Sequence, residues 1–290
     1  MIKDSIDYLI KIATNSPYSD NLLEARKEYQ GFIGDIFEDD KSYENQMALF
    51  LEWFIFERID SAHKQTILES IINNNNEIPP HILKFIDLYK SNIHGLFLIK
   101  KIKKDYVRVV NLFEDESYDA IELSGDLYFS KNSIFEGRLL PHENSYCFTG
   151  NFCFHPEESK KFIKREINKI TLTHKINEKK LKVKISKLNC ETKKLKKAIK
   201  IIDKIKKDIQ SSKSDKKISK YNDLLTDLVV NKSKYEKNCT LLSDEILNFK
   251  NEIIIKERKQ KQTSLMLRLT SKRLLLERSR KIEIKDIYKD

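Results

Sequence analysis

Glycine and proline, the residues that most often interrupt regular secondary structure, are absent from the last part of this 290-residue chain. All six Gly lie between Gly31 and Gly150, and all five Pro lie between Pro17 and Pro156. The 134 residues from 157 to 290 contain neither. A stretch of that length without a helix breaker is hard to reconcile with a loop-connected globular fold, so it predicts long helices.

Cysteine and long apolar runs are also scarce. The four Cys, at positions 147, 153, 190 and 239, do not form the dense framework of a disulfide-rich secreted domain. The first residues include acids where a signal peptide needs an apolar core. No apolar run approaches the roughly 18–20 residues that span a bilayer. We therefore expect a soluble, cytoplasmic protein of a reducing compartment, with no membrane span.

Charge changes sign at the point where Gly and Pro end. Residues 1–156 carry 16 Lys and Arg against 25 Asp and Glu, a net charge of −9. Residues 157–290 carry 39 against 19, a net charge of +20. An AT-rich genome raises Lys, Asn and Ile everywhere, but it does not produce an acidic first part, so the asymmetry indicates two parts with different roles.

Motifs of catalysis are missing. The sequence has no Walker A, Gly-x-Gly-x-x-Gly, Gly-x-Ser-x-Gly or His-Glu-x-x-His pattern. We expect a protein that is not an enzyme and that uses no cofactor. One alternative stays open, because Glu122 and Glu136 fall on adjacent predicted strands, where a carboxylate pair could perform acid–base chemistry.

A zinc site would require His142, Cys147, Cys153 and His155 to converge. There is no Cys-x-x-Cys pair, and the two Cys are six residues apart on one strand face, about 20 Å at 3.3 Å per residue. Only a tight turn at residues 150–151 would bring them together. We therefore expect two buried thiols that behave as small hydrophobes, and no metal.

Residues 1–94 show the three- and four-residue apolar spacing that is typical of amphipathic helices. Four such patterns are present, at residues 6–12, 22–29, 47–55 and 82–88. The fourth follows an Asn-rich loop and begins at prolines, which suit a first helical turn. These residues predict an N-terminal helical bundle.

From Gly95 the apolar period changes to two, the period of strands. Five short segments alternate in this way, at residues 97–99, 107–112, 120–123, 134–140 and 146–154. Five strands within about 60 residues predict a small antiparallel β barrel of the SH3-like or OB-like kind over residues 95–156.

Exposed rings on such a barrel could stack nucleic-acid bases. The candidate rings are those of Tyr106, Phe113, Tyr118, Tyr128 and Phe129. Residues 95–156 carry 7 Lys and Arg against 9 Asp and Glu, which is the wrong sign for a polyanion groove. We expect most of these rings to lie in the core or in an interface.

Residues 157–262 contain two sustained heptad repeats, the pattern of coiled-coil packing. The first runs from Ile167 to Ile209 through Leu188, Leu195 and Ile202, with a partner series four residues later that includes Ile185, Thr192 and Ile199. The second runs from Ile218 to Ile253, with a partner series three residues later, from Tyr221 to Phe249. The polar segment 210–216 separates them, so we predict an antiparallel coiled-coil hairpin and an α+β fold class overall.

The tail, residues 263–290, has too many apolar residues for a solvated end. Residues 281–287 alternate as a strand does. We expect the tail either to pack back on the preceding domains or to dock on another protein.

Cations gather at two places that we consider candidate sites for a partner or a polyanion. The first lies on the tip-side half of the first arm helix and comprises Lys193, Lys194, Lys196, Lys197 and Lys200. The second lies in the tail and comprises Arg268, Lys272, Arg273, Arg278 and Arg280. For the lysines, the simpler alternative is a solvated helix surface.

Five segments carry a resemblance to known sequences. They are Glu24-Ala-Arg-Lys-Glu-Tyr, Gly34-Asp-Ile-Phe-Glu-Asp-Asp40, Phe50-Leu-Glu-Trp-Phe-Ile-Phe-Glu-Arg58, Ser91-Asn-Ile-His-Gly-Leu-Phe97 and Phe135-Glu-Gly-Arg-Leu-Leu-Pro141. Together they resemble an uncharacterised family of bacterial proteins over residues 20–156, without the arm. The resemblance implies one folded unit there and brings no activity and no functional residue.

These observations favour a non-enzymatic scaffold or adaptor that engages another protein through the arm and the tail. The alternative is a nucleic-acid or ribosome-binding protein that uses the basic arm. The sequence gives no oligomeric state.

Overall fold

The computed structural model describes residues 2–60, 64–74, 78–122, 129–212, 214–279 and 281–289. The chain divides into two compact units. One, the head, comprises residues 1–168 and 262–290, and the other, the arm, comprises residues 169–261. Helices, a small β barrel and a long helical hairpin together confirm the predicted α+β class.

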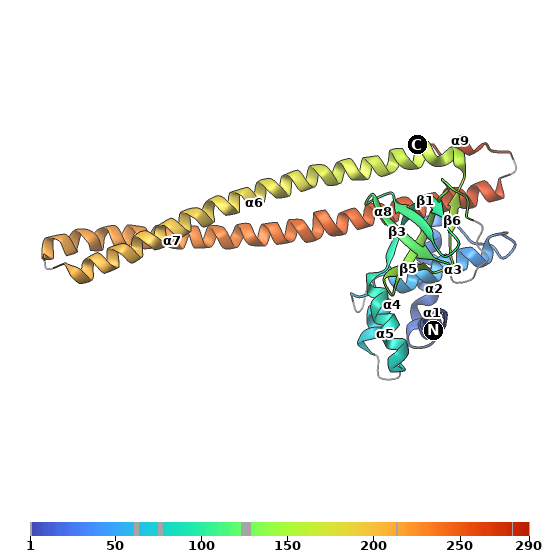
Figure 1. Cartoon of the computed structure of the whole chain (residues 1–290), viewed down its shortest axis with the longest axis horizontal. Coiled ribbons are helices and arrows are strands. Elements are labelled where there is room, and N and C mark those ends of the chain that lie inside the picture. Colours follow the sequence, from blue (N-terminus) through green and yellow to red (C-terminus); the bar gives the residue numbers. More distant parts are fainter. Residues whose placement is uncertain are drawn as a thin grey trace. The chain divides into compact units, whose positions relative to one another are not determined.

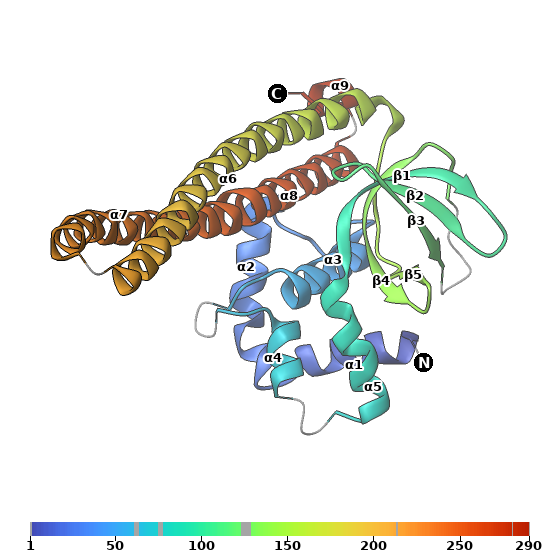
Figure 2. The ribbon, with the colours of Figure 1, turned by 60° about the vertical axis from the view of Figure 1, so that its left-hand side comes forward.

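Five α-helices and two 3-10 turns precede the barrel within the described part of the head (Figure 2). They are α1 (Ile2–Ala13), η1 (Tyr18–Asn21), α2 (Leu22–Ile33), α3 (Tyr43–Phe56), α4 (Ile67–Asn73), α5 (Pro80–Leu88) and η2 (Tyr89–Ser91). Their apolar faces share one core, in which Leu9, Phe54 and Ile86 are almost fully buried. The four predicted helices are all present, and α5 begins at a proline as expected.

Helix α4 is an element that the apolar spacing did not predict. It begins at a capping box, in which the Thr66 side chain accepts from the Glu69 backbone and the Glu69 carboxylate accepts from the Thr66 backbone. The sequence Thr66-Ile-Leu-Glu69 is the signature of that motif, so a signal for this helix was present.

The sheet contains six strands, ordered β1-β2-β3-β5-β4-β6, and its first five strands in this order close into a barrel because β1 also pairs with β4. The strands are β1 (Ile93–Ile102), β2 (Val107–Asn111), β3 (Glu116–Ile121), β4 (Ile134–His142), β5 (Ser145–Phe148) and β6 (Cys153–His155). Five strands form the closed barrel, as predicted. One pairing departs from the antiparallel expectation, because β3 and β5 run parallel.

The fifth predicted strand is interrupted, which gives β5 and β6. Both pieces pair with β4, β5 with its end at residues 139–142 and β6 with its start at residues 134–136. Gly150, with φ of 98°, lies in the interruption, where a left-handed backbone favours glycine. The turn therefore sits where the sequence placed it, but it redirects the chain along β4 rather than folding Cys153 back on Cys147.

Most of the candidate aromatic rings are core. Phe113 is buried, and Phe129 packs against Phe135 and Phe148 with ring centroids 5.8 and 5.3 Å apart. Tyr118 meets Tyr146 edge-on at 5.2 Å. Tyr128 lies outside the described residues.

The C-terminal tail belongs to the head. Helix α8 (Glu257–Arg278) buries Leu265, Met266, Leu269 and Leu274 there, and the short α9 (Ile284–Ile287) buries Ile287. Of the two expectations for the tail, packing on its own chain is the one observed. The prediction of a strand at residues 281–287 is wrong, because residues 284–287 form the helix α9.

The arm is a hairpin of two long antiparallel helices (Figure 1). α6 (Lys160–Ser211), which follows the short 3-10 turn η3 (Glu157–Ser159), forms one side. α7 (Asp215–Asn248), the π-helical segment η4 (Phe249–Lys256) and the start of α8 form the other. Cross-helix contacts fix the register: Lys184 Nζ lies 3.0 Å from Glu245, and Asn238 donates to Glu191 at 3.1 Å. Among the described residues, we find no helix whose length and apolar content would allow it to cross a bilayer.

The contact seam of the second arm helix follows the predicted heptads, whereas that of the first is partly different. Ile202 is buried as predicted, but its buried companions are Ala198 and Ile205, which follow the seam positions Leu195 and Ile202 by three residues. The predicted companions Ile185 and Ile199 are 39% and 36% exposed. The partner series on α6 therefore lies one residue earlier than the sequence suggested.

Candidate macromolecular interface

The five candidate lysines of α6 all point their charge into solvent. Lys193, Lys194, Lys196, Lys197 and Lys200 are exposed on the tip-side half of the helix. Lys194 Nζ donates to Glu191 at 2.7 Å, which raises the pKa of Lys194 and lowers that of Glu191. The other four form no ion pair with any residue that the structure describes. They are therefore available to an anionic partner.

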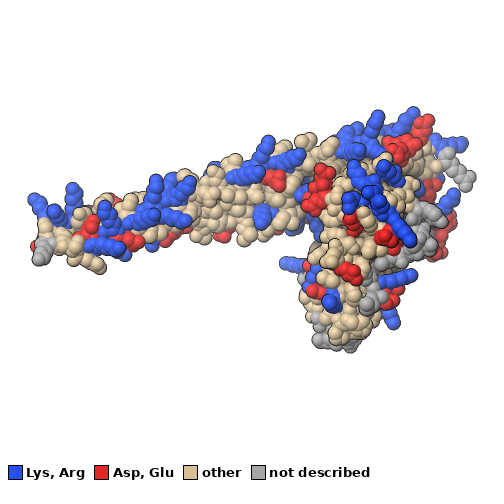
Figure 3. Space-filling model, in the orientation of Figure 1, with Lys and Arg blue, Asp and Glu red and all other residues tan. Residues whose placement is uncertain are grey.

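The whole arm has an excess of cations. Residues 169–261 carry 27 Lys and Arg against 12 Asp and Glu, a net charge of +15. Lys and Arg side chains stand along the arm in the space-filling view (Figure 3). Pairs such as Lys184–Glu245 and Lys232–Glu236 use some of the acids, and the cations of the arm outnumber its acids by fifteen. Such a field attracts anionic macromolecules over about one Debye length.

The tail cations differ from the arm lysines, because their charges are used inside the head. Arg268 pairs with Glu166, and Arg273 donates to the Phe154 backbone oxygen at 3.1 Å. Lys272 donates to the Ile287 backbone oxygen. Arg280 lies outside the described residues.

Arg278 clamps the end of α8 to the acidic loop before α3. Its Nε donates to Asp40 at 2.8 Å, and its guanidinium lies 4.7 Å from the centroid of the Phe37 ring. The hydrogen bond with Arg278 lowers the pKa of Asp40 and raises that of Arg278. The four described tail cations therefore hold α8 and α9 in place within the head.

Sequence reasoning missed a buried ionic cluster at the meeting point of α3, β1, β4 and α8. Arg138 is only 1% exposed. Its guanidinium donates to Glu57 at 2.7 Å, to Glu52 at 3.2 Å and to Asn92. The antiparallel register places His94 of β1 directly opposite Arg138 of β4. The cluster thus joins groups 86 residues apart in the chain, which periodicity does not reveal.

His94 is the second cation of this cluster. Nδ1 of His94 pairs with Glu57, and Nε2 lies 3.1 Å from Glu136. Burial opposes the charged ring, but the carboxylates of Glu57 and Glu136 together outweigh burial and raise the pKa of His94 to about 9. Burial likewise opposes the Glu57 carboxylate, yet His94 and Arg138 hold its pKa well below the usual range. Thr270 of α8 donates to Glu136 at 2.9 Å, which adds the tail to the cluster.

The cluster pairs its charges rather than exposing any of them to a substrate. Two cations face three carboxylates, those of Glu52, Glu57 and Glu136. Buried networks of this kind fix one arrangement of the elements that contribute to them. The arrangement therefore supports a structural role.

The carboxylate pair and the cysteine residues that the sequence offered as candidates for chemistry do not form a site. Glu122 follows β3 and Glu136 lies on β4, and these strands are not neighbours, so the prediction of adjacency is wrong. Cys147 and Cys153 pair with β4 at Leu140 and Glu136, and burial raises their pKa values to about 11 and 12. Within the described ranges, no group of three or more His, Cys, Asp or Glu side chains could hold a metal ion.

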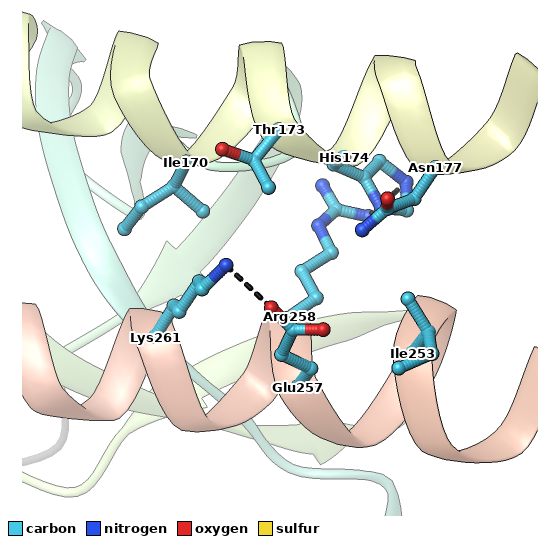
Figure 4. Close-up of a pocket in the computed structure, with 8 residues that line it drawn as sticks. All are labelled: Ile170, Thr173, His174, Asn177, Ile253, Glu257, Arg258 and Lys261. Atoms are coloured by element: carbon cyan, nitrogen blue, oxygen red, sulfur yellow. Dashed lines mark hydrogen bonds and ion pairs between the residues drawn. The ribbon is translucent and has the colours of Figure 1, made fainter.

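The described residues border two cavities, one in the arm and one in the head. In the arm, His174, Asn177 and Arg258 border a cavity of about 10 Å³, which has room for one water molecule (Figure 4). Nη1 of Arg258 lies 3.2 Å from Nε2 of His174, so this is a polar layer in the seam. In the head, a cavity of about 510 Å³ between α1 and α4 is bordered by Tyr8, Tyr18 and other residues, of which Lys11 alone is charged. The arm cavity has no room for a substrate beyond one water molecule, and the described lining of the head cavity contains no carboxylate or imidazole that could act beside Lys11.

Comparison with known proteins identifies a family and no function. The model of a family of unknown function, DUF7986, matches residues 11–187, so the chain belongs to this family. The match confirms the resemblance seen over residues 20–156 and extends it into α6. Searches of the curated proteins and of the solved structures found no significant match.

Proposed function

We propose that this member of the DUF7986 family is a scaffold or adaptor without enzymatic activity, and that its arm binds another protein. The observation that carries the proposal is the number of large hydrophobic side chains that the arm exposes. Of twenty large hydrophobic residues that are exposed among the described residues, twelve lie on the arm: Leu172, Ile176, Val183, Ile185, Ile199, Ile201, Leu224, Val229, Val230, Leu241, Leu247 and Ile255. Exposed aliphatic residues are thus more frequent on the arm than on the head, and where such residues adjoin one another they mark a protein interface.

The interface in this proposal is the arm rather than the tail. Six apolar residues of the tail are buried in the head: Leu265, Met266, Leu267, Leu269, Leu274 and Ile287. A partner that used them would first have to displace α8 and its contacts, Thr270–Glu136 and Arg278–Asp40. The exposed aliphatic residues of the arm carry no such cost.

A nucleic-acid partner is the second candidate, and the lysines at 193–200 favour it. Phosphate binding requires exposed cations, which the arm supplies. It does not require exposed aliphatic side chains, and it commonly uses Arg, of which the arm has one, Arg258. A protein partner accounts for both the charges and the aliphatic residues.

A pull-down with the full chain, with and without nuclease, separates the two candidates. We expect a protein to be recovered after nuclease treatment. Replacing Lys193, Lys194, Lys196 and Lys197 by Gln should alter helix stability only slightly, because Gln is nearly as good a helix former as Lys. Submicromolar RNA or DNA binding that falls steeply with salt and disappears in this variant would refute the proposal, because neutralised phosphates release counterions.

A further inference from the structure

The outward face of α6 near the base of the arm carries a stripe of exposed aliphatic residues. Leu172, Ile176 and Val183 are 60%, 54% and 57% exposed. Intervals of four and seven residues place them on one side of a helix. The next heptad position is Cys190, which is exposed and free. We call residues 172, 176, 183 and 190 the outward stripe.

The outward stripe points away from the partner helix of the hairpin. Each of its last three residues follows a half-buried seam residue, His174, Leu181 or Leu188, by two positions. Two residues correspond to about 200° around a helix, and the same three residues precede the other seam series at 177, 184 and 191 by about 100°, so the stripe lies on the outer side of α6. The hairpin by itself therefore leaves it uncovered.

Lysines border the outward stripe on both sides. Residues 169–190 contain seven Lys and a single acid, Glu178. Glu178 Oε1 lies 3.3 Å from His174 Nε2, at the seam. The lysines beside the stripe are exposed: Lys175, Lys179, Lys180, Lys182 and Lys187. The surface thus combines an apolar line with positive edges.

We infer that the outward stripe binds an acidic amphipathic helix of another protein. The apolar side chains of that helix would contact Leu172, Ile176 and Val183, and its carboxylates would meet the flanking lysines. The hairpin and the added helix would form a three-helix coiled coil, a common mode of helix recognition. This inference rests on the proposed function and names the chemistry of the partner.

Charge and composition argue against other occupants. A second arm would bring another net charge of +15, so like charges oppose self-association through this face. Interfacial membrane helices insert bulky aromatic residues as well as aliphatic ones. The arm's Tyr221, Tyr235 and Phe249 lie half-buried in the seam instead. An acidic helix satisfies both the lysines and the aliphatic stripe.

The binding test uses a defined probe and the full chain. The probe is a fluorescent three-heptad peptide with Leu at the two seam positions and Glu at the flanking positions, and a peptide of equal composition with scrambled Leu positions is its control. Replacing both Ile176 and Val183 by Ser should weaken probe binding about tenfold or more, since each aliphatic side chain would lose its burial. Replacing Val230 and Leu241 by Ser is the matched control, because these residues are 64% and 53% exposed on α7. We expect the control to bind the probe as the wild type does.

Equal binding of the probe and the scrambled peptide would overturn the inference, because charge alone would then suffice. Wild-type affinity in the variant with both Ile176 and Val183 replaced would also overturn it. Circular dichroism should show unchanged helix content in both variants, since all four replaced side chains are exposed.

Cys190 allows a second test on the native partner. Its thiol is exposed, whereas Cys147 and Cys153 are buried and Cys239 is half-buried, so a maleimide photocrosslinker should modify Cys190 first. We expect the crosslinked peptide to come from an acidic segment with heptad spacing, and its yield to fall when Ile176 and Val183 are replaced. A crosslink to a second copy of this chain, to nuclease-sensitive material or to lipid overturns the inference. If the variant with Ile176 and Val183 replaced still recovers the protein partner, the inference fails while the proposed function stands. If the wild-type chain recovers no protein at all, the proposed function fails too.

Discussion

Replacing Arg138 by Met is the sharpest test of the buried ionic cluster. The side chain is 1% exposed, and its guanidinium lies 4.5 Å from the centroid of the Phe56 ring as well as beside Glu52 and Glu57. Met preserves most of the length and the apolar contact with Phe56. The substitution therefore removes the charge and its hydrogen bonds with little change in packing.

The expected loss of head stability is about 3 kcal/mol. Breaking a buried ion pair by removing one partner costs about 3–5 kcal/mol, because the other charge is left buried without compensation. Here the compensation is not lost completely. Glu57 keeps His94, and Glu52 still accepts from Asn151 at 2.8 Å, so we expect the lower end of that range.

Trp53 supplies the assay, because it is the one Trp of the chain and lies 8% exposed in α3. Urea unfolding followed by its fluorescence reports the free energy of unfolding of the head. The matched control is Arg108→Met. Arg108 pairs with Asp119 at 2.6 Å, but the two side chains are 45% and 37% exposed, so the expected loss of stability is much smaller than for Arg138→Met. Equal losses for the two variants, or a loss under about 1 kcal/mol for Arg138→Met, would refute a structural role for the cluster.

Three further predictions concern other parts of the molecule. The pKa of His94 is about 9 when folded and about 6.5 when unfolded, so its stabilisation is complete below pH 6.5 and disappears as pH rises through 9. His94→Gln should flatten this alkaline decline in urea titrations, and an unchanged slope would contradict the assignment. Ile202→Ala should destabilise the arm by about 2–4 kcal/mol in thermal melts followed by far-ultraviolet circular dichroism, because the Ile202 side chain is only 5% exposed. Ile201→Ala should cost under about 1 kcal/mol, because Ile201 is 46% exposed. Equal effects would show that the seam is wrongly placed. Thr270→Val should cost about 1–3 kcal/mol in the same Trp fluorescence assay by leaving an oxygen of Glu136 unpaired, and no loss would mean that α8 is not held there.

The arm was predictable because helical packing repeats along the chain. Residues 157–290 lack Gly and Pro, and the heptads of the second helix gave its seam residue by residue. The first helix offers two apolar choices at neighbouring positions, Ala198 and Ile199. Composition favours the larger side chain for a core, yet Ala198 is 5% exposed and Ile199 is 36% exposed. Which one faces inward depends on the angle at which the other helix approaches, and that angle is not written in either repeat.

The buried cluster of the head was not predictable, because it depends on register between distant elements. In the sequence, Glu52 and Glu57 are indistinguishable from the ordinary polar residues of a helix, one within α3 and one at its C-terminal end. His94 and Arg138 face each other only once β1 and β4 are paired. At this pairing Gly95 lies opposite Gly137, and a Cβ on Gly137 would come within 3.0 Å of the Phe135 ring. Such a close approach leaves no pattern that a single sequence displays.

The charged residues of the head and of the arm have different surroundings, and this difference bears on where a partner would bind. In the head, cations such as Arg138 and Arg278 are committed to carboxylates of the same chain, so they hold the fold. In the arm, 27 Lys and Arg face only 12 Asp and Glu, so the excess positive charge can attract an anionic binding partner. The family match ends at residue 187, which includes Leu172, Ile176 and Val183 but not the lysines at 193–200. The aliphatic residues of the outward stripe therefore lie within the segment that the family model describes, whereas the lysine cluster near the tip lies outside it.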